Sequence, residues 1–373
     1  METVGIVGLG AMGLGIAQVF AQAGFAVRAT DARAEGRAGA LARLRASLAQ
    51  RIEAGKMAEA ELAALAARLT VVETAEEIGQ VAMVVEAIVE DLAAKRALWA
   101  RLAPVAGAGC VFATNTSALS VTEMAAGLGH PERLLGLHFF NPAPAMKLVE
   151  LVGHAGSSAE ALATARRLTE AAGKVVIGCA DRPGFIVNRC ARPFYGEALA
   201  LLEAGRSASE IDASMLAAGY RMGPFALIDL IGADINLAAT EGLARAMANH
   251  PRYHVFDALR AQVASGDLGR KTGRGFLWPD APGVAPTDAG AIAVRIEAAL
   301  VNEAASLVAE GAVGPADVDT AMKLGLNFPR GPFEALKRHG LPAILTMLDH
   351  LEKTAPVILR GRYDPAGNLK ELA

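Results

Sequence analysis

Cysteine, aromatic residues and long apolar runs are all scarce in this chain. Only three cysteines occur among 373 residues, and Cys110, Cys179 and Cys190 lack the spacing of a metal or redox motif. We therefore expect buried, reduced thiols, no metal site and a cytoplasmic location. No segment approaches the roughly 18 uninterrupted apolar residues of a membrane span, which predicts a soluble protein.

An excess of positive charge is missing as well. The net charge is -3, so the chain has no basic footprint for nucleic acid. Residues 1–3 carry neither the basic region nor the apolar stretch of a secretory signal. We expect neither a nucleic-acid partner nor a membrane partner. The length favours two or three domains.

A glycine-rich turn follows the first apolar stretch. Gly8, Gly10 and Gly13 come after residues 4–7, and an Ala-rich helical segment follows them. Gly8 permits a tight turn, Gly10 leaves room for a phosphate, and Gly13 lets the helix approach the strand. Such a turn sets backbone N–H groups against a pyrophosphate. We interpret it, with Met12 included, as a dinucleotide-binding turn.

Asp31 ends the second apolar run, 18 residues after Gly13. That distance is near the roughly 20 residues typical of the acid that bonds the ribose hydroxyls. Arg33 offers a positive charge for a 2′-phosphate, but Asp31 would repel one. The pattern favours NAD over NADP.

Apolar runs and helical stretches alternate through the first half of the chain. This alternation predicts an α/β fold, a Rossmann-type, doubly wound and mostly parallel sheet. A long Ala/Arg/Glu-rich insert at 34–67 reads as two antiparallel helices broken at Gly55, serving as padding or as an arm toward the distal part of a substrate. The expected strands are 4–7, 26–30, 69–72, 82–88, 111–114, 134–139, 147–152 and 174–178.

Strand signals stop after Asp181-Arg182-Pro183-Gly184, and helical stretches take over. We therefore expect a nucleotide-binding domain at 1–182 and an all-α domain at 183–280. A Pro/Gly-rich linker at 281–291 precedes a second all-α domain at 292–373.

The two all-α segments repeat one another at an offset of 106 to 108 residues. Gly223-Pro224-Phe225 returns as Gly331-Pro332-Phe333, and Ile211-Asp212 returns as Val318-Asp319. Chance similarity between Ala-rich helices would not keep Gly-Pro-Phe in register, so we infer a duplicated helical domain. The second copy lacks the Pro183 to Asn188 entry, and we expect it to be structural.

Two polar residues interrupt consecutive apolar strands. His138 lies within 134–139 and Glu150 within 147–152, 12 residues apart with a turn between them. Each can offset the other's burial if they form a hydrogen bond. A carboxylate that orients an imidazole makes a general base, because histidine titrates near neutral pH. A satisfied core histidine beside an unrelated carboxylate is the alternative.

Taken together, the motifs resemble the 3-hydroxyacyl-CoA dehydrogenase family from residue 4 to about 278. The matching segments are Gly8-Leu9-Gly10-Ala11-Met12-Gly13, Val85-Glu86-Ala87-Ile88-Val89-Glu90 with Lys95, Asn115-Thr116-Ser117, His138-Phe139-Phe140-Asn141-Pro142, Met146-Lys147-Leu148-Val149-Glu150, Pro183-Gly184-Phe185-Ile186-Val187-Asn188 and Gly269-Arg270-Lys271-Thr272-Gly273.

The resemblance implies NAD-dependent oxidation of the 3-hydroxyl of a 3-hydroxyacyl-CoA, with a place in fatty acid metabolism. It implies that His138 is the general base, that Glu150 orients it, and that Ser117 and Asn188 hydrogen-bond the reacting part of the substrate. The acyl-CoA would enter between the first two domains. Glu90, Lys95 and Asn115 match cofactor-contacting positions, and Ser47 and Lys56 match CoA-contacting positions.

The second helical copy resembles that of longer relatives, in which an internal copy mimics a dimer partner. We expect either a monomer with an internal pseudo-dimer or a homodimer. A gulonate-type or carnitine-type dehydrogenase is the competing enzyme, and a non-catalytic NAD-binding protein is the alternative from another class. The 3-hydroxyisobutyrate type also opens with a similar glycine motif, but its catalytic lysine helix finds no match here.

Overall fold

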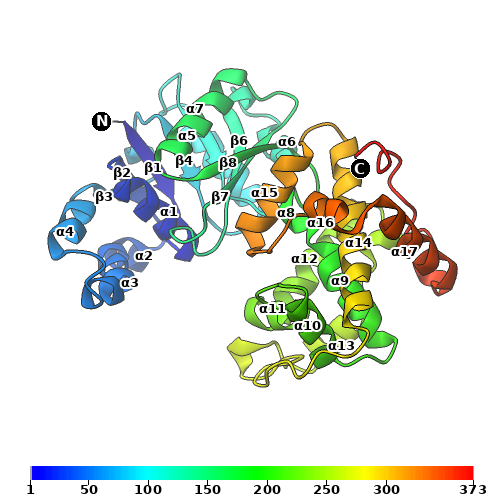
Figure 1. Cartoon of the computed structure of the whole chain (residues 1–373). Coiled ribbons are helices and arrows are strands. Elements are labelled where there is room, and N and C mark those ends of the chain that lie inside the picture. Colours follow the sequence, from blue (N-terminus) through cyan, green and yellow to red (C-terminus); the bar gives the residue numbers. More distant parts are fainter. Residues whose placement is uncertain (1, 373) are drawn as a thin grey trace. The chain divides into compact units, whose positions relative to one another are not determined.

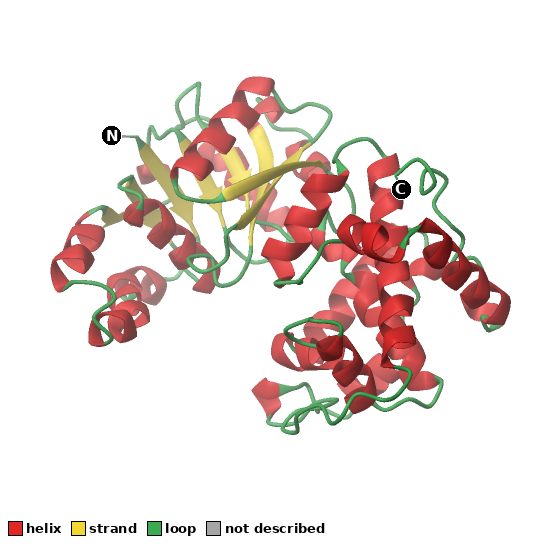
Figure 2. Cartoon of the chain, in the orientation of Figure 1, coloured by secondary structure: helices red, strands yellow, loops and turns green. Residues whose placement is uncertain are grey.

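A computed structural model describes residues 2–372 and divides the chain into two compact units, Met1–Arg182 and Pro183–Ala373. Figure 1 follows the chain through both units, and Figure 2 shows that the long strands belong to the first of them. Residues 183–280 and 292–373, expected as two all-α domains, share the second unit. The expected linker at 281–291 is irregular up to its last residues, where a helix begins at Ala289.

The described part of the first unit forms one eight-stranded sheet in the order β3-β2-β1-β4-β5-β6-β7-β8. All neighbouring strands run parallel except β6 and β7, because a short turn joins these two. All eight strands lie where the apolar runs predict them. Their bounds are β1 Thr3–Val7, β2 Ala26–Thr30, β3 Leu69–Val71, β4 Met83–Glu86, β5 Val111–Thr114, β6 Leu134–Phe139, β7 Leu148–Gly153 and β8 Val175–Ala180.

Helices cover both faces of this sheet, as expected for a doubly wound fold. The core on one face joins side chains of the sheet to those of α1, α3, α4 and α7, and on the other face Trp99 of α5 stacks on Phe112 of β5. The helices of this unit are α1 Ala11–Gln22, α2 Ala34–Ala38, α3 Ala40–Glu53, α4 Glu59–Ala67, α5 Leu92–Leu102, α6 Val121–Ala125 and α7 Ala159–Ala171.

The insert at 34–67 is helical and breaks after α3, where Gly55 adopts a φ of 66°. That angle favours glycine, which explains why the break falls there. A further break at Gly39 separates the short α2 from α3. The apolar pattern did not predict this second break.

The second unit is built from helices, and the four α-helices of its second half correspond in order to four of the helices in its first half. The first half holds α8 Val187–Cys190, α9 Arg192–Glu203, α10 Ala208–Ala217, α11 Pro224–Ile231, α12 Ala233–Ala246 and α13 Asp257–Ala264. The second half holds α14 Ala289–Ala309, α15 Pro315–Leu326, α16 Pro332–His339 and α17 Leu341–Thr354.

A carboxylate caps the corresponding helix in each half. Asp212 accepts hydrogen bonds from the backbone N–H groups of Phe225 and Ala226, at 2.9 and 2.7 Å. Asp319 accepts the equivalent pair from Phe333 and Glu334, at 2.8 and 3.1 Å. We call 183–278 and 289–372 the first and second repeats. Helix α14 of the second repeat packs against α9 and α10 of the first.

Cys110 and Cys190 are buried, Cys179 is partly buried, and none of the three forms a disulfide. Burial raises the pKa of the Cys110 thiol to about 11, which keeps it protonated and unreactive. Within residues 2–372, no helix combines the length and the hydropathy needed to cross a bilayer.

Candidate functional site

The expected site residues of the first unit gather along one edge of its sheet. Gly8 follows β1, Asp31 follows β2, Glu90 follows β4, and Asn115 follows β5. These four strands are parallel to their neighbours, so their carboxyl ends share an edge. Ligands of open α/β sheets bind outside this edge, at helix N-termini.

The glycine turn has the shape that a pyrophosphate needs. Gly8 has a φ of 96°, and a Cβ on Gly13 would lie 1.8 Å from the carbonyl oxygen of Gly8, so the helix and the turn touch. A Cβ on Gly10 would meet no heavy atom within 4 Å among the described residues. Gly10 is also the N-cap of α1, so no cap side chain covers the first N–H groups of that helix. Met12 lies in this first turn.

Asp31 braces the turn from the side. Its carboxylate accepts hydrogen bonds from the backbone N–H groups of Leu9, at 2.8 Å, and Arg33, at 2.9 Å. Burial alone raises the pKa of Asp31, but these donors hold it below its ordinary value. The side chain is therefore ionised at neutral pH and disfavours a second negative charge, as expected for NAD rather than NADP.

A cavity of about 360 Å³ opens beside Asp31. Its walls come from β1, β2, α2, α5 and the segments after β3 and β4, and they include Thr30, Arg37, Ile88 and Leu98. The mixture of apolar walls with the charged side chains of Asp31, Glu73, Arg37 and Arg101 suits an adenosine half. The residues present therefore fit a dinucleotide.

Lys95 and Glu90 belong to a network that also includes a carboxylate the sequence analysis did not single out. Lys95 is 1% exposed, and its Nζ lies 2.5 Å from Oε1 of Glu86 and 3.3 Å from Oε2 of Glu90. Glu90 accepts hydrogen bonds from the Thr116 hydroxyl and from the Ser117 N–H, at 2.5 and 3.2 Å. The network therefore braces the loop that carries Ser117.

Glu86 is fully buried at the end of β4 and also accepts a 2.8 Å hydrogen bond from the Thr114 hydroxyl. The sequence could have singled out Glu86, because it is a carboxylate inside an apolar strand, as Glu150 is. The Oδ1 atom of Asn115 accepts a hydrogen bond from the Phe139 N–H at 2.8 Å. This bond ties the cofactor-side loop to the strand that holds His138.

His138 and Glu150 meet as the sequence predicts. They are direct cross-strand partners in the antiparallel β6–β7 pair, so both side chains leave the same face of the sheet. Nδ1 of His138 lies 2.7 Å from Oε2 of Glu150. His138 is 7% exposed and Glu150 is fully buried. A carboxylate can only accept when it is ionised, so this contact suits an Nδ1–H donor, and Nε2 is the ring nitrogen on the side away from Glu150.

Four expected residues remain. Ser117 is exposed in the loop after β5, and Asn188 is part of the short helix α8 in the second unit. Ser47 lies on α3, where its hydroxyl donates to the Leu44 carbonyl at 2.8 Å, and Lys56 lies exposed in the turn before α4. The first unit by itself unites the cofactor residues, His138, Glu150 and Ser117.

Two family models match the chain. The model described as 3-hydroxyacyl-CoA dehydrogenase, NAD binding domain, matches residues 3–182. The model described as 3-hydroxyacyl-CoA dehydrogenase, C-terminal domain, matches twice, at 184–278 and 290–372. The two C-terminal matches coincide with the two repeats.

The individual relatives are 3-hydroxyacyl-CoA dehydrogenases as well. The chain is 32% identical to the 3-hydroxyadipyl-CoA dehydrogenase of Escherichia coli, with 100% of this chain and 98% of the relative covered. It is 38% identical to a probable 3-hydroxybutyryl-CoA dehydrogenase of Bacillus subtilis over 74% of this chain and 96% of the relative. A crystal structure of 3-hydroxybutyryl-CoA dehydrogenase from Escherichia coli superposes with a TM-score of 0.90 at 31% identity, covering 99% and 98% of the two chains.

The shorter Bacillus relative leaves about a quarter of this chain unmatched, whereas the Escherichia coli relative matches throughout. The glycine turn, the ionised Asp31 and the cavity beside it agree with the family's NAD-binding domain. The chain belongs to the 3-hydroxyacyl-CoA dehydrogenase family and is an NAD-dependent oxidoreductase.

Proposed function

We propose that this protein catalyses the reversible oxidation of a 3-hydroxyacyl-CoA to the 3-oxoacyl-CoA, with His138 as the general base. The observation that carries the proposal is the 2.7 Å contact between His138 and the buried Glu150. Both residues lie in strands that reach the cofactor edge of the sheet. NAD, when bound, supplies the acceptor for the hydride that leaves C3.

The pair would handle the hydroxyl proton. Glu150 fixes the imidazole so that Nδ1 carries its proton and Nε2 faces away from the carboxylate. Nε2 takes the proton of the 3-hydroxyl, and the negative charge of Glu150 stabilises the imidazolium that results. In the reverse direction, the same imidazolium returns the proton to the 3-oxo group.

Ser117 and Asn188 would hydrogen-bond the reacting end of the substrate. Gly8, Gly10, Met12, Gly13 and Asp31 would hold the dinucleotide. Glu90, Lys95 and Asn115 would contribute to its nicotinamide end, with Lys95 acting through Glu86 and Glu90 because its amine is buried between them. Ser47 and Lys56, on and beside α3, would contact CoA.

The second repeat would take the place of a partner subunit. Its α14 packs on α9 and α10, where a second copy of the first repeat could otherwise lie. We propose a monomer with an internal pseudo-dimer. Sedimentation of the whole chain tests this, and a stable homodimer would contradict it.

The test of the proposed chemistry is NADH consumption with acetoacetyl-CoA. His138→Ala should lower kcat by about 10²- to 10⁴-fold, because positioned proton transfer contributes that much. NADH binding, followed by fluorescence, should stay unchanged. His154→Ala is the matched control. His154 belongs to the same unit but follows the antiparallel strand β7, at the opposite edge of the sheet, where its Nε2 lies 3.1 Å from the Pro131 carbonyl oxygen.

Wild-type turnover in His138→Ala would disprove the assignment of the base. Parallel assays with gulonate and carnitine separate the competing enzyme, because neither should be oxidised at a comparable rate. A comparison of short, long and dicarboxylic 3-hydroxyacyl-CoAs would then define the acyl group.

A further inference from the structure

Helix α8, which carries Asn188, is a single turn that needs support from its surroundings. It spans only Val187–Cys190 and is separate from α9, whose first turn contains Pro193. One helical turn is unstable by itself, so its position depends on packing. The helix contacts α14 and α15, which both belong to the second repeat.

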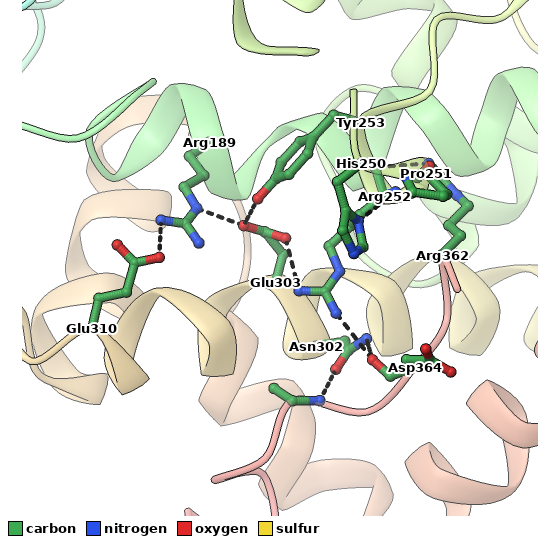
Figure 3. Close-up of polar contacts among 11 residues, drawn as sticks. Arg189, His250, Pro251, Arg252, Tyr253, Asn302, Glu303, Glu310, Arg362 and Asp364 are labelled. Atoms are coloured by element: carbon green, nitrogen blue, oxygen red, sulfur yellow. Dashed lines mark hydrogen bonds and ion pairs between the residues drawn. The ribbon is translucent and has the colours of Figure 1, made fainter. Parts of the chain in front are cut away.

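Arg189, the residue after Asn188, anchors this turn to α14. Its guanidinium is 1% exposed and lies between two carboxylates, with Nε 2.6 Å from Oε1 of Glu303 and Nη1 2.7 Å from Oε1 of Glu310 (Figure 3). Although burial lowers the pKa of Arg189, the charge of Glu303 raises it above its ordinary value. Arg189 is therefore charged, and the two carboxylates hold its guanidinium in one geometry.

Glu303 is itself fixed by residues of the first repeat. It is fully buried, and its carboxylate accepts a 2.6 Å hydrogen bond from the Tyr253 hydroxyl and lies 3.5 Å from Nη1 of Arg252 (Figure 3). Removing one partner of such a buried ionic group leaves an uncompensated charge. The position of Glu303 thus determines the position of Arg189.

The backbone before α8 closes onto the same residue. Gly184 and Phe185 have φ angles of 74° and 48°, and the N–H of Arg189 donates to the Gly184 carbonyl at 3.0 Å. A Cβ on Gly184 would lie 3.0 Å from that nitrogen. Arg189 is thereby held through its backbone on one side and through its side chain on the other.

A matching arrangement surrounds Glu197 of the first repeat, but there the arginine does not follow an asparagine. Glu197 contacts Nε of Arg295 at 2.9 Å, Nε of Arg362 at 2.7 Å and the Tyr363 hydroxyl at 3.1 Å. Two arginines and a tyrosine of the second repeat thus surround the first repeat's carboxylate. However, the residue before Arg295 is Val294, and it lies within the continuous helix α14.

We propose that Glu303 of the second repeat is a positioning residue for the reaction: through Arg189 it fixes α8 and so aims the Asn188 amide. This inference rests on the substrate contact proposed for Asn188. It assigns to the second repeat a task in catalysis, where the sequence suggested a structural role.

The experiment compares Glu303→Gln with Glu197→Gln in the full-length enzyme. Each substitution removes the charge of one buried glutamate that contacts two arginines and a tyrosine, so the two variants should lose similar amounts of thermal stability. Glu303→Gln should lower kcat by about tenfold or more, because small misplacements of a positioning group are costly. Glu197→Gln should keep kcat within about twofold, and NADH affinity should stay unchanged in both.

A double-mutant cycle with Asn188→Ala shows whether Glu303 acts through Asn188. Asn188→Ala/Glu303→Gln should turn over no more slowly than Asn188→Ala. The inference is overturned if Glu303→Gln keeps wild-type kcat, if both glutamine variants lose kcat alike, or if the double variant loses the full product of the single effects. Should Glu303→Gln fail to fold, Glu303→Asp carries the same cycle. Full activity of Asn188→Ala would instead refute the proposed role of Asn188.

Discussion

The two helical repeats of the second unit share a framework and differ in Asn188, the residue that we propose contacts the substrate. Both retain an aspartate that caps the helix beginning at Pro224 or Pro332, and both retain an Arg, Glu and Tyr set that pairs with the other copy. Only the first repeat has Asn188 on a separate turn of helix. The comparison indicates that packing constrains both copies, and the proposed role of Asn188 adds a constraint from the reaction on the first copy alone.

The repeats also differ at their ends. In the first repeat Asp229 accepts hydrogen bonds from the N–H groups of Phe276, Leu277 and Trp278, which fold the closing segment back onto α11. The corresponding helix of the second repeat, α16, has basic residues in its last turn. At the 108-residue offset Lys337 takes the place of Asp229, so the second copy has no carboxylate at this position to accept such hydrogen bonds.

The largest difference between the repeats should appear in activity. Asn188→Ala should lower kcat/KM for acetoacetyl-CoA by about a hundredfold, the usual cost of losing one hydrogen-bond donor to a developing negative charge. Val294→Asn, the reciprocal change in the second repeat, should leave the rate unchanged. Equal losses in the two variants would show that the copies are not functionally distinct.

A smaller difference is expected in stability. Asp212→Ala and Asp319→Ala each leave two backbone N–H groups without their carboxylate, at a cost of about 2 kcal/mol in the free energy of unfolding. Asp212 is fully buried and Asp319 is 7% exposed, so the first variant should be the less stable. Urea unfolding measures both, and a greater loss in Asp319→Ala would contradict the ranking.

The smallest difference between the repeats concerns how the free energy of unfolding depends on pH. Burial raises the pKa of Asp212 to about 7, against the effect of its two N–H donors, and burial also raises the pKa of Asp319. Between pH 4 and 7 the folded state keeps a proton that the unfolded state has lost, so the free energy of unfolding falls as pH rises. The slope is at most about 1.4 kcal/mol per pH unit for one group.

Asp212→Asn should flatten this slope, and Asp319→Asn should flatten it less. Unfolding curves collected at several pH values between 4 and 7 provide the measurement. An unchanged slope in Asp212→Asn would assign the titration to another group.

Much of the first unit could be predicted because its strands are short apolar runs separated by helices. His138 and Glu150 stood out because polar side chains are costly in such runs, and the antiparallel register then placed them opposite each other. Glu86 is also a polar side chain in an apolar run. It was not singled out, because it lay inside a family motif and because its partners Lys95 and Thr114 come from different elements. The order of polar and apolar residues within one strand does not reveal contacts between residues of different elements.

The exchange of ion pairs between the repeats could not be predicted, for a geometric reason. Arg189 precedes Glu197 by eight residues, and Arg295 precedes Glu303 by the same interval. The sequence therefore fits pairing within a copy as well as pairing across copies. Only packing shows that each arginine contacts the other copy's glutamate.

Cross-pairing of two copies on one polypeptide has an evolutionary consequence. In a symmetric homodimer, every substitution is made twice, so a change that suits one half is imposed on the other. Here a single codon alters one half alone. The second copy can therefore evolve separately as a support for the first. Duplication of a gene segment can in this way turn a contact between subunits into a contact within one chain, where mutation can change either side independently.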